Sequence, residues 1–235
     1  MKITRLQTIL VEGWVFVKVH TDEPGLVGLG EGTVGSKGAS VAAAIEDMER
    51  MLVGRDPLQI EGLWQMMYRG PRWRGGPILC SAISAIDIAL WDIKGKEADR
   101  PIYQLLGGAC RDRVRLYAHA NGPSPRAAAE NALHWKEQGF TAAKTGPLQV
   151  VDGVIRLPES LIRGVAKIQA MREAVGDGFD ILIDAHGQLT PTMAVEYAER
   201  VKEYRPMFLE ECTQPEDLDA LAWLAARVQV PLATG

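Results

Sequence analysis

Hydrophobic and polar positions alternate in the first part of the chain and then recur at helical spacing. Residues 2–11 and 14–20 alternate and contain many β-branched and aromatic side chains, so they predict two strands. Residues 25–32 predict a turn followed by a short strand. Residues 40–54 and 58–70 predict helices, and the long apolar run 78–98 predicts a buried helix. Strands followed by helices indicate an α+β domain, which we assign to residues 1–113.

From residue 114 the pattern changes to strands that alternate with helices. Prolines stand near three of the predicted helix starts, in the pairs Ser124-Pro125, Thr190-Pro191 and Gln214-Pro215, where a capping residue followed by proline suits a helix N-terminus. Alternation at this spacing predicts βαβ units and a parallel sheet. The predicted strands are 114–120, 141–145, 180–185, 207–211 and 231–234, and the predicted helices are 126–138, 159–175, 192–204 and 216–228.

Both an open doubly wound sheet and a (β/α)8 barrel fit this α/β pattern. No G-x-G-x-x-G follows a strand after residue 114, whereas polar residues stand at several strand ends, as in barrel enzymes. We therefore expect residues 114–235 to form the first part of a TIM-like barrel with about five strands. Because a whole barrel takes about 250 residues, we expect the barrel to be incomplete and the chain to be truncated.

Composition excludes some classes of function. The net charge of −4 and the absence of a basic run argue against nucleic-acid binding. We find no apolar segment of the roughly 18 residues that span a bilayer, and the N-terminus does not resemble a signal peptide. Cys80, Cys110 and Cys212 form no CxxC pair, which favours a cytoplasmic protein; a buried, structural Cys212 is the simpler interpretation than a catalytic thiol. Exposed edges of a partial barrel favour association, so we expect a homo-oligomer.

Candidate chemistry lies at the ends of the predicted strands. Asp184 and Glu210 are one βα unit apart, so adjacent parallel strands would bring both carboxylates to one rim, where oxygen ligands suit Mg²⁺. His186 follows Asp184 by two residues and would face the same cavity as an acid or base. Lys144 ends an earlier strand and would either contact an acidic substrate or neutralise the carboxylates. The alternative is an ordinary polar loop, with Asp184 as a turn former and Glu210-Glu211 as a solvated pair.

Several stretches in combination resemble the mandelate racemase/muconate lactonizing branch of the enolase superfamily. These are DAHG at 184–187, FLEE at 208–211 and PLATG at 231–235, with GLVGLGEGT, SAIDIALWDIKGK and PIYQLLGG in the first domain. The resemblance implies an α+β capping domain, a modified TIM barrel and Mg²⁺ held by three acids. It also implies removal of a proton alpha to a carboxylate to give an enediolate. By position Asp184 and Glu210 match the first two ligands, and the third ligand and the base would follow Gly235.

The D-x-H pair resembles the acid-sugar dehydratases, in which the matching histidine is the general acid for departure of the 3-hydroxyl. Where racemase-like members have K-x-K, this chain has Lys144-Thr145-Gly146, and Cys212 replaces the usual proline after the two glutamates. We therefore expect a Mg²⁺-dependent hydro-lyase that converts an aldonic acid, such as D-galactonate, to a 2-keto-3-deoxy acid. The alternatives are a racemase or epimerase on the same scaffold and a non-catalytic partial barrel. We expect the 235-residue chain by itself to be inactive.

A Gly-rich stretch of the first domain, YRGPRWRGG, carries Arg72, Trp73 and Arg74. The resemblance implies that capping-domain loops select the substrate, and two arginines suit a polyhydroxy acid. A solvated loop with one packed tryptophan is the alternative.

Overall fold

The chain folds into two compact units, Met1–Asp112 and Arg113–Gly235. The computed structural model describes residues 1–147, 156 and 158–235. The domain boundary predicted after residue 113 lies beside the division between the units. Each unit has its own hydrophobic core.

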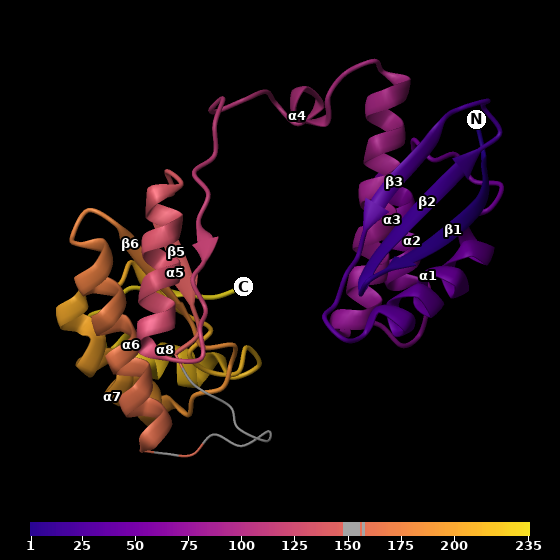
Figure 1. The fold of residues 1–235 in the computed structure, drawn as a ribbon. Coiled ribbons are helices and arrows are strands. Elements are labelled where there is room, and N and C mark those ends of the chain that lie inside the picture. The colour runs from indigo at the N-terminus through magenta and orange to yellow at the C-terminus, as the bar shows by residue number, and fades with distance from the viewer. Residues whose placement is uncertain (148–155, 157) are drawn as a thin grey trace. The chain divides into compact units, whose positions relative to one another are not determined.

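The first unit is a three-stranded antiparallel sheet covered by helices, as the α+β pattern predicts (Figure 1). Alternation in the second strand buries Val15, Val17 and Val19 completely, because every second side chain faces the helices. The core is apolar and includes Ile45, Ile86 and other side chains of the two longest helices. The elements are β1 (Ile3–Val11), β2 (Trp14–Thr21), β3 (Val27–Glu31), α1 (Gly38–Leu52), α2 (Ile60–Arg69), α3 (Gly76–Glu97) and the short α4 (Ile102–Leu105).

Glycines of β3 let the sheet approach α3 backbone to backbone. A Cβ atom at Gly28 would overlap the carbonyl oxygen of Ala89, and one at Gly30 would overlap that of Ala85. Only glycine leaves room for this approach. The run of alternating glycines in this strand is therefore a packing device.

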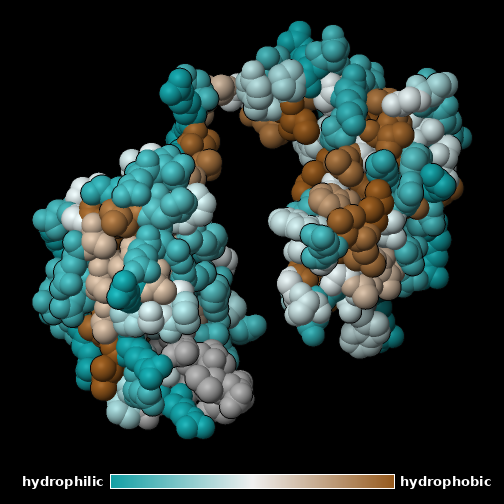
Figure 2. Space-filling view, in the orientation of Figure 1, coloured by the Kyte–Doolittle hydropathy of each residue, from teal (hydrophilic) through white to brown (hydrophobic). Residues whose placement is uncertain are grey.

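Helix α3 corrects one expectation about apolar length. By length and composition alone it could cross a membrane, so the statement that no apolar segment is long enough is wrong. Eight of its residues are buried in the first unit, and those that pack on β3 include Ala85 and Ala89. Leu29 in β3 and Ile88 in α3 are exposed. Figure 2 shows apolar surface on one face of this unit. The high apolar content of α3 is thus explained by the many residues that it buries in the core of the first unit.

The second unit is a parallel sheet with the strand order β4-β5-β6-β7-β8, flanked by helices (Figure 1). This confirms the predicted α/β class and the five strands. Its core joins strand residues such as Ile181 and Ile183 to helix residues such as Ile168 and Tyr197. The elements are β4 (Ala118–His119), α5 (Pro125–Glu137), β5 (Ala142–Thr145), α6 (Glu159–Val175), β6 (Asp180–Asp184), α7 (Pro191–Val201), the 3-10 turn η1 (Lys202–Tyr204), β7 (Phe208–Glu210), α8 (Leu218–Ala225) and β8 (Leu232–Ala233).

The first strand of this sheet is much shorter than the predicted 114–120. Val114 and Leu116 are exposed, and Arg115 between them forms an ion pair of 2.7 Å with Asp180. Its guanidinium also donates to the side-chain oxygen and the carbonyl of Thr141. Side-chain contacts thus hold Arg115 in place, although backbone hydrogen bonds of a β-strand were predicted there.

Two of the three proline-marked helix starts are confirmed. The side chain of Ser124 accepts a hydrogen bond from the Ala127 amide at 3.2 Å, and that of Thr190 accepts one from Met193 at 3.3 Å. The start expected at Gln214-Pro215 is wrong, because α8 begins at Leu218 and its cap is Asp217. Asp217 is the better cap because its carboxylate accepts from the third residue into the helix.

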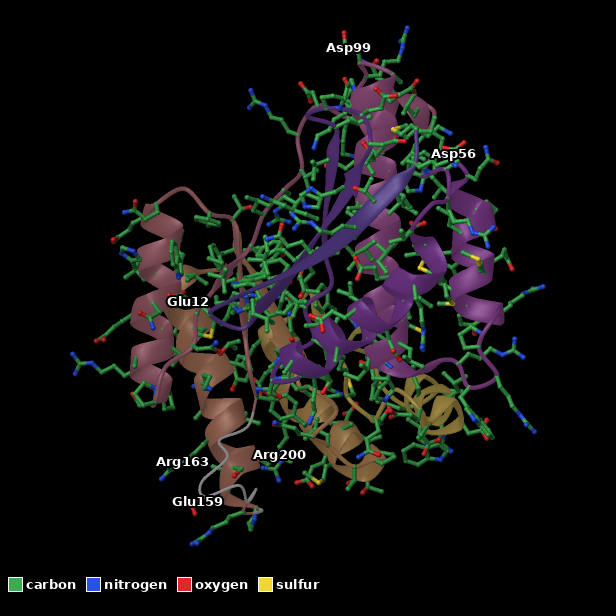
Figure 3. The ribbon with its side chains drawn as sticks, turned by 90° about the vertical axis from the view of Figure 1, so that its right-hand side faces the viewer. Glu12, Asp56, Asp99, Glu159, Arg163 and Arg200 are labelled. Atoms are coloured by element: carbon green, nitrogen blue, oxygen red, sulfur yellow. The ribbon has the colours of Figure 1, made fainter. Side chains whose placement is uncertain are left out.

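Charged side chains cover the outer faces of the second unit's helices (Figure 3). Arg163 pairs with Glu159 at 3.0 Å along α6, and Arg200 pairs with Glu196 at 2.6 Å along α7. These pairs are exposed and contribute little to stability. The charged residues that form the candidate site lie at the carboxyl ends of the strands instead.

Candidate metal centre

The predicted acids meet at the carboxyl ends of two neighbouring strands. Asp184 and Glu210 are direct partners in the parallel ladder between β6 and β7. Neighbouring strands of a parallel sheet end at the same edge, so their last side chains share one rim. The Asp184 side chain is 7% exposed and the Glu210 side chain 24%. Glu211, with a φ of 46°, lies outside the strand.

Lys144 binds both carboxylates. Its ammonium lies 2.8 Å from Oδ2 of Asp184 and 3.2 Å from Oε2 of Glu210, and it stands 5.4 Å from the ring centre of Tyr117. Burial opposes the charge of Lys144, but the hydrogen bonds to Asp184, Glu210 and Tyr117 outweigh it and raise the pKa of this lysine. Of the two roles left open for Lys144, neutralising the carboxylates matches this geometry.

His186 contacts the same acid, although not for the expected reason. The prediction for His186 rested on extended backbone from Asp184 to residue 186, but β6 ends at Asp184 and His186 has a φ of 50°. In this left-handed turn the His186 amide donates to Oδ1 of Asp184 at 3.1 Å, and Nε2 lies 3.1 Å from Oδ2. Left-handed backbone at a non-glycine residue is strained, and such strain tends to cluster at functional sites.

A cavity of about 210 Å³ opens beside these groups. The predicted residues Lys144, Asp184 and His186 line it, together with His119 and Asn121, which were not among the predicted residues. Oδ1 of Asn121 accepts hydrogen bonds from the Thr145 hydroxyl and the Gly146 amide, both at 3.3 Å. Both missed residues come at the end of the first strand, so the strand-end rule that selected Asp184 would also have found them.

Arg72, Trp73 and Arg74 belong to the first unit. The Arg72 guanidinium lies 5.6 Å from the centre of the Trp73 ring, and Trp73 is 79% exposed. Trp73 and Arg74 line a separate cavity of about 210 Å³ with Met48 and Leu79. These three residues therefore form a local group, and their role in substrate binding stays a prediction.

Cys212 is buried and is not among the predicted ligands. Burial raises the pKa of the Cys212 thiol to about 12, and its sulfur donates to the Leu209 carbonyl at 3.4 Å, as suits a structural cysteine.

Among residues 1–147, 156 and 158–235, no three His, Cys, Asp or Glu side chains converge on one point. The described residues thus offer two carboxylates, which are hard oxygen donors of the kind that Mg²⁺ takes along with water or substrate oxygens.

Comparison with known families matches nearly the whole chain. Residues 3–107 match the N-terminal domain of the mandelate racemase/muconate lactonizing enzyme family. Residues 126–235 match the family described as enolase C-terminal domain-like.

Curated relatives are about two fifths identical to this chain over the residues that align. A D-galactonate dehydratase of Ralstonia nicotianae is 40% identical over 236 residues, and one of Klebsiella pneumoniae is 39% identical. Both alignments cover 100% of this chain and 61% of the relative. The chain thus spans about three fifths of the length of these relatives.

Solved structures agree with the sequence matches. A member of the enolase superfamily from Salmonella Typhimurium is 31% identical with a TM-score of 0.92, covering 100% of this chain and 67% of that one. An enolase from Pantoea ananatis, solved with bound d-gluconate and Mg, is 32% identical with a TM-score of 0.90, covering 100% and 65%. Given both domain matches and these neighbours, the chain belongs to the mandelate racemase/muconate lactonizing enzyme branch of the enolase superfamily.

Proposed function

We propose that the protein acts as a Mg²⁺-dependent dehydratase of an aldonic acid, giving a 2-keto-3-deoxy acid. The observation that carries the proposal is the convergence of Asp184, Glu210 and His186 at one rim, with the two acids as ladder partners. Relatives named D-galactonate dehydratase and a neighbour with bound d-gluconate and Mg support the substrate class.

Asp184 and Glu210 are the residues that would hold the metal. Each already directs one carboxylate oxygen at a single cationic group, the ammonium of Lys144, so the pair suits one small cation. When bound, Mg²⁺ supplies positive charge that stabilises the negative charge developing on a substrate carboxylate.

His186 is the proposed general acid for the departing hydroxyl. Its side chain is 65% exposed and borders the cavity, so a substrate can reach Nε2. Dehydration transfers a proton from the carbon next to the carboxylate to a general base and removes a hydroxyl from the following carbon. A proton given to that hydroxyl by His186 lets it leave as water, and the resulting enol becomes the 2-keto group.

The cavity also offers groups that orient a polyhydroxy acid. Asn121, held by two hydrogen bonds, presents a fixed polar edge, and His119 lies beside Lys144 in the ladder between β4 and β5. Fixed polar groups of this kind select among hydroxyl configurations, because a mismatched substrate leaves them unpaired.

The test is a screen of aldonic acids with the product of the whole gene. We expect a 2-keto-3-deoxy acid with Mg²⁺, none with EDTA, and a loss of turnover of about 100-fold or more in His186→Asn. A Gln188→Ala variant, on the cavity wall but outside the proposed chemistry, serves as the control. Failure of every aldonate to give a keto acid would refute the proposal. Deuterium exchange at the alpha carbon without water loss would support a racemase or epimerase instead.

A further inference from the structure

We propose that Lys144 is an exchangeable internal counter-ion, which occupies the place of the divalent cation in the metal-free protein and must leave when the metal binds. This proposal rests on the proposed function only in assigning the cation to Asp184 and Glu210. It concerns the metal-free state of the site and the competition between two cations.

The carboxylates that hold the ammonium are the ones that would hold the metal. Oδ2 of Asp184 and Oε2 of Glu210 lie 2.8 and 3.2 Å from the Lys144 nitrogen. A Mg²⁺ ion needs its oxygens at about 2.0–2.1 Å, so it would occupy the space of the ammonium. Two cations cannot share this position, and binding of one excludes the other.

The site holds this charge tightly. Only 12% of the Lys144 side chain is exposed, and the Asp184 side chain opposite is 7% exposed. The face of the Tyr117 ring, 5.4 Å from the ammonium, adds a further attraction for a cation. Without Lys144 or a metal, two adjacent carboxylates would face each other with their repulsion uncompensated.

A displaced ammonium has somewhere to go. The cavity beside the acids is lined by Lys144 itself and by polar groups that include His119, Asn121 and Thr145. The four-carbon stem of a lysine is flexible enough to turn into such a space. Arrival of the metal would therefore move a positive charge from the carboxylates into the cavity.

The first experiment measures Mn²⁺ affinity by electron paramagnetic resonance, with Mn²⁺ as the probe for Mg²⁺. Lys144→Met keeps the length of the side chain and removes the competing charge, so its affinity should rise by about tenfold over that of the unmodified chain. Lys144→Met combined with Asp184→Asn should lose this gain, which locates the binding at the two acids. Affinity equal to or below that of the unmodified chain, including no binding at all, would overturn the proposal.

The second experiment uses the unmodified protein and does not depend on how the variant folds. An amine-reactive label, read by mass spectrometry, should modify Lys144 slowly in EDTA and several-fold faster with saturating Mn²⁺. Lys136, whose ammonium donates to the Val175 carbonyl at 2.7 Å, is the control and should react at the same rate in both conditions. Equal protection of Lys144 with and without metal contradicts the exchange. Absence of dehydratase activity, by contrast, would refute only the proposed function.

Discussion

The two units fix their helices in different ways. In the first unit, the N-cap positions of α1, α2 and α3 are Lys37, Gln59 and Gly75, and none of these residues caps its helix with a side chain. In the second unit, α5, α7 and α8 have side-chain caps at Ser124, Thr190 and Asp217, whereas α6 has none. The first unit relies on packing over an antiparallel sheet, and the second adds a capping hydrogen bond at three of its four described α-helices.

The three capped helices follow strand ends near the candidate site, although α6, which follows the strand of Lys144, is uncapped. Each capped helix comes after a strand end and the loop that carries Asn121, His186 or Glu211. A capping hydrogen bond fixes where the helix begins, so it also fixes where the preceding loop ends. The second unit thus combines capped helices with ion-paired charged side chains at one edge of its sheet.

The largest effect on stability should come from the packing of the first unit. Gly30→Val places a side chain against the Ala85 carbonyl, so α3 must move away from β3. We expect a loss of about 3 kcal/mol in the free energy of unfolding, at the upper end of overpacking effects. Hydrogen exchange read by mass spectrometry should show lost protection in residues 1–112 and little change in residues 113–235.

Gly62→Ala is the matched control for that variant. Gly62 lies inside α2, and a Cβ there meets nothing within 4 Å. Alanine should stabilise this helix by about 0.5–1 kcal/mol because it has the higher helix propensity. Comparable damage from both substitutions would mean that the contact between β3 and α3 is not what holds the unit together.

The next largest effect should come from the charged strand end of the second unit. Asp184→Ala removes one of the two acids that pair with Lys144 and the acceptor of the His186 amide. We expect a loss of about 2 kcal/mol in EDTA, below the range for a fully buried pair because Glu210 still holds the lysine. Urea unfolding measures it.

Asp180→Ala, at the opposite end of the same strand, provides the comparison. Asp180 pairs with Arg115 at 2.7 Å, but both side chains are about half exposed, so its loss should cost at most about 1 kcal/mol. If Asp180→Ala proved the more damaging of the two, buried charge at the rim would not be the stabilising feature.

A smaller effect should separate capped from uncapped helices. Thr190→Ala removes the hydrogen bond to the Met193 amide and should destabilise the second unit by about 1 kcal/mol. Lys37→Ala, at the uncapped start of α1, should change stability by less than about 0.5 kcal/mol. Thermal unfolding measures the midpoint of both variants. Equal shifts in midpoint would show that the side-chain cap at Thr190 does not stabilise its helix.

Hydrophobic periodicity predicted most of the fold. Alternation located β1 and β2, and strand–helix alternation located the five parallel strands, because burial in a layered fold imposes these periods. It failed at residues 114–120, where side-chain contacts of Arg115 replace ladder bonds. It also misplaced the start of α8, since a proline next to a polar residue marks a turn as readily as a helix.

Sequence patterns predicted which residues form the candidate site better than they predicted how these residues contact one another. Spacing by one βα unit brought Asp184 and Glu210 together, because ladder partners follow from a parallel register. The turn at His186 was not predictable, since no glycine marks its positive φ. The joint ion pair of Lys144 also depends on side-chain rotamers, which strand periodicity does not specify.

The smallest predicted effect on stability concerns Asp87, an acid in the first unit. Burial, and next the charge of Glu61, raise the pKa of Asp87 in α3. An acid with a raised pKa in the folded state favours folding below its unfolded value, about 3.9, and this contribution is lost as the pH rises through the folded value. Asp87→Asn should therefore stabilise the chain at pH 7 and have no such benefit near pH 3. The gain should be only about 0.3 kcal/mol, because water screens a partly buried carboxylate.

Asp92, one turn further along α3, gives this prediction its contrast. Its carboxylate accepts from the Leu29 amide at 2.8 Å and from Lys96 at 2.7 Å, so it ties the helix to β3. Asp92→Asn removes the charge from both hydrogen bonds and should destabilise the unit at pH 7, opposite in sign to Asp87→Asn. Urea unfolding at pH 7 and pH 3 measures both variants. The same sign for both at pH 7 would show that charge in α3 matters by its total, whereas opposite signs would show that the partners of each carboxylate decide its effect.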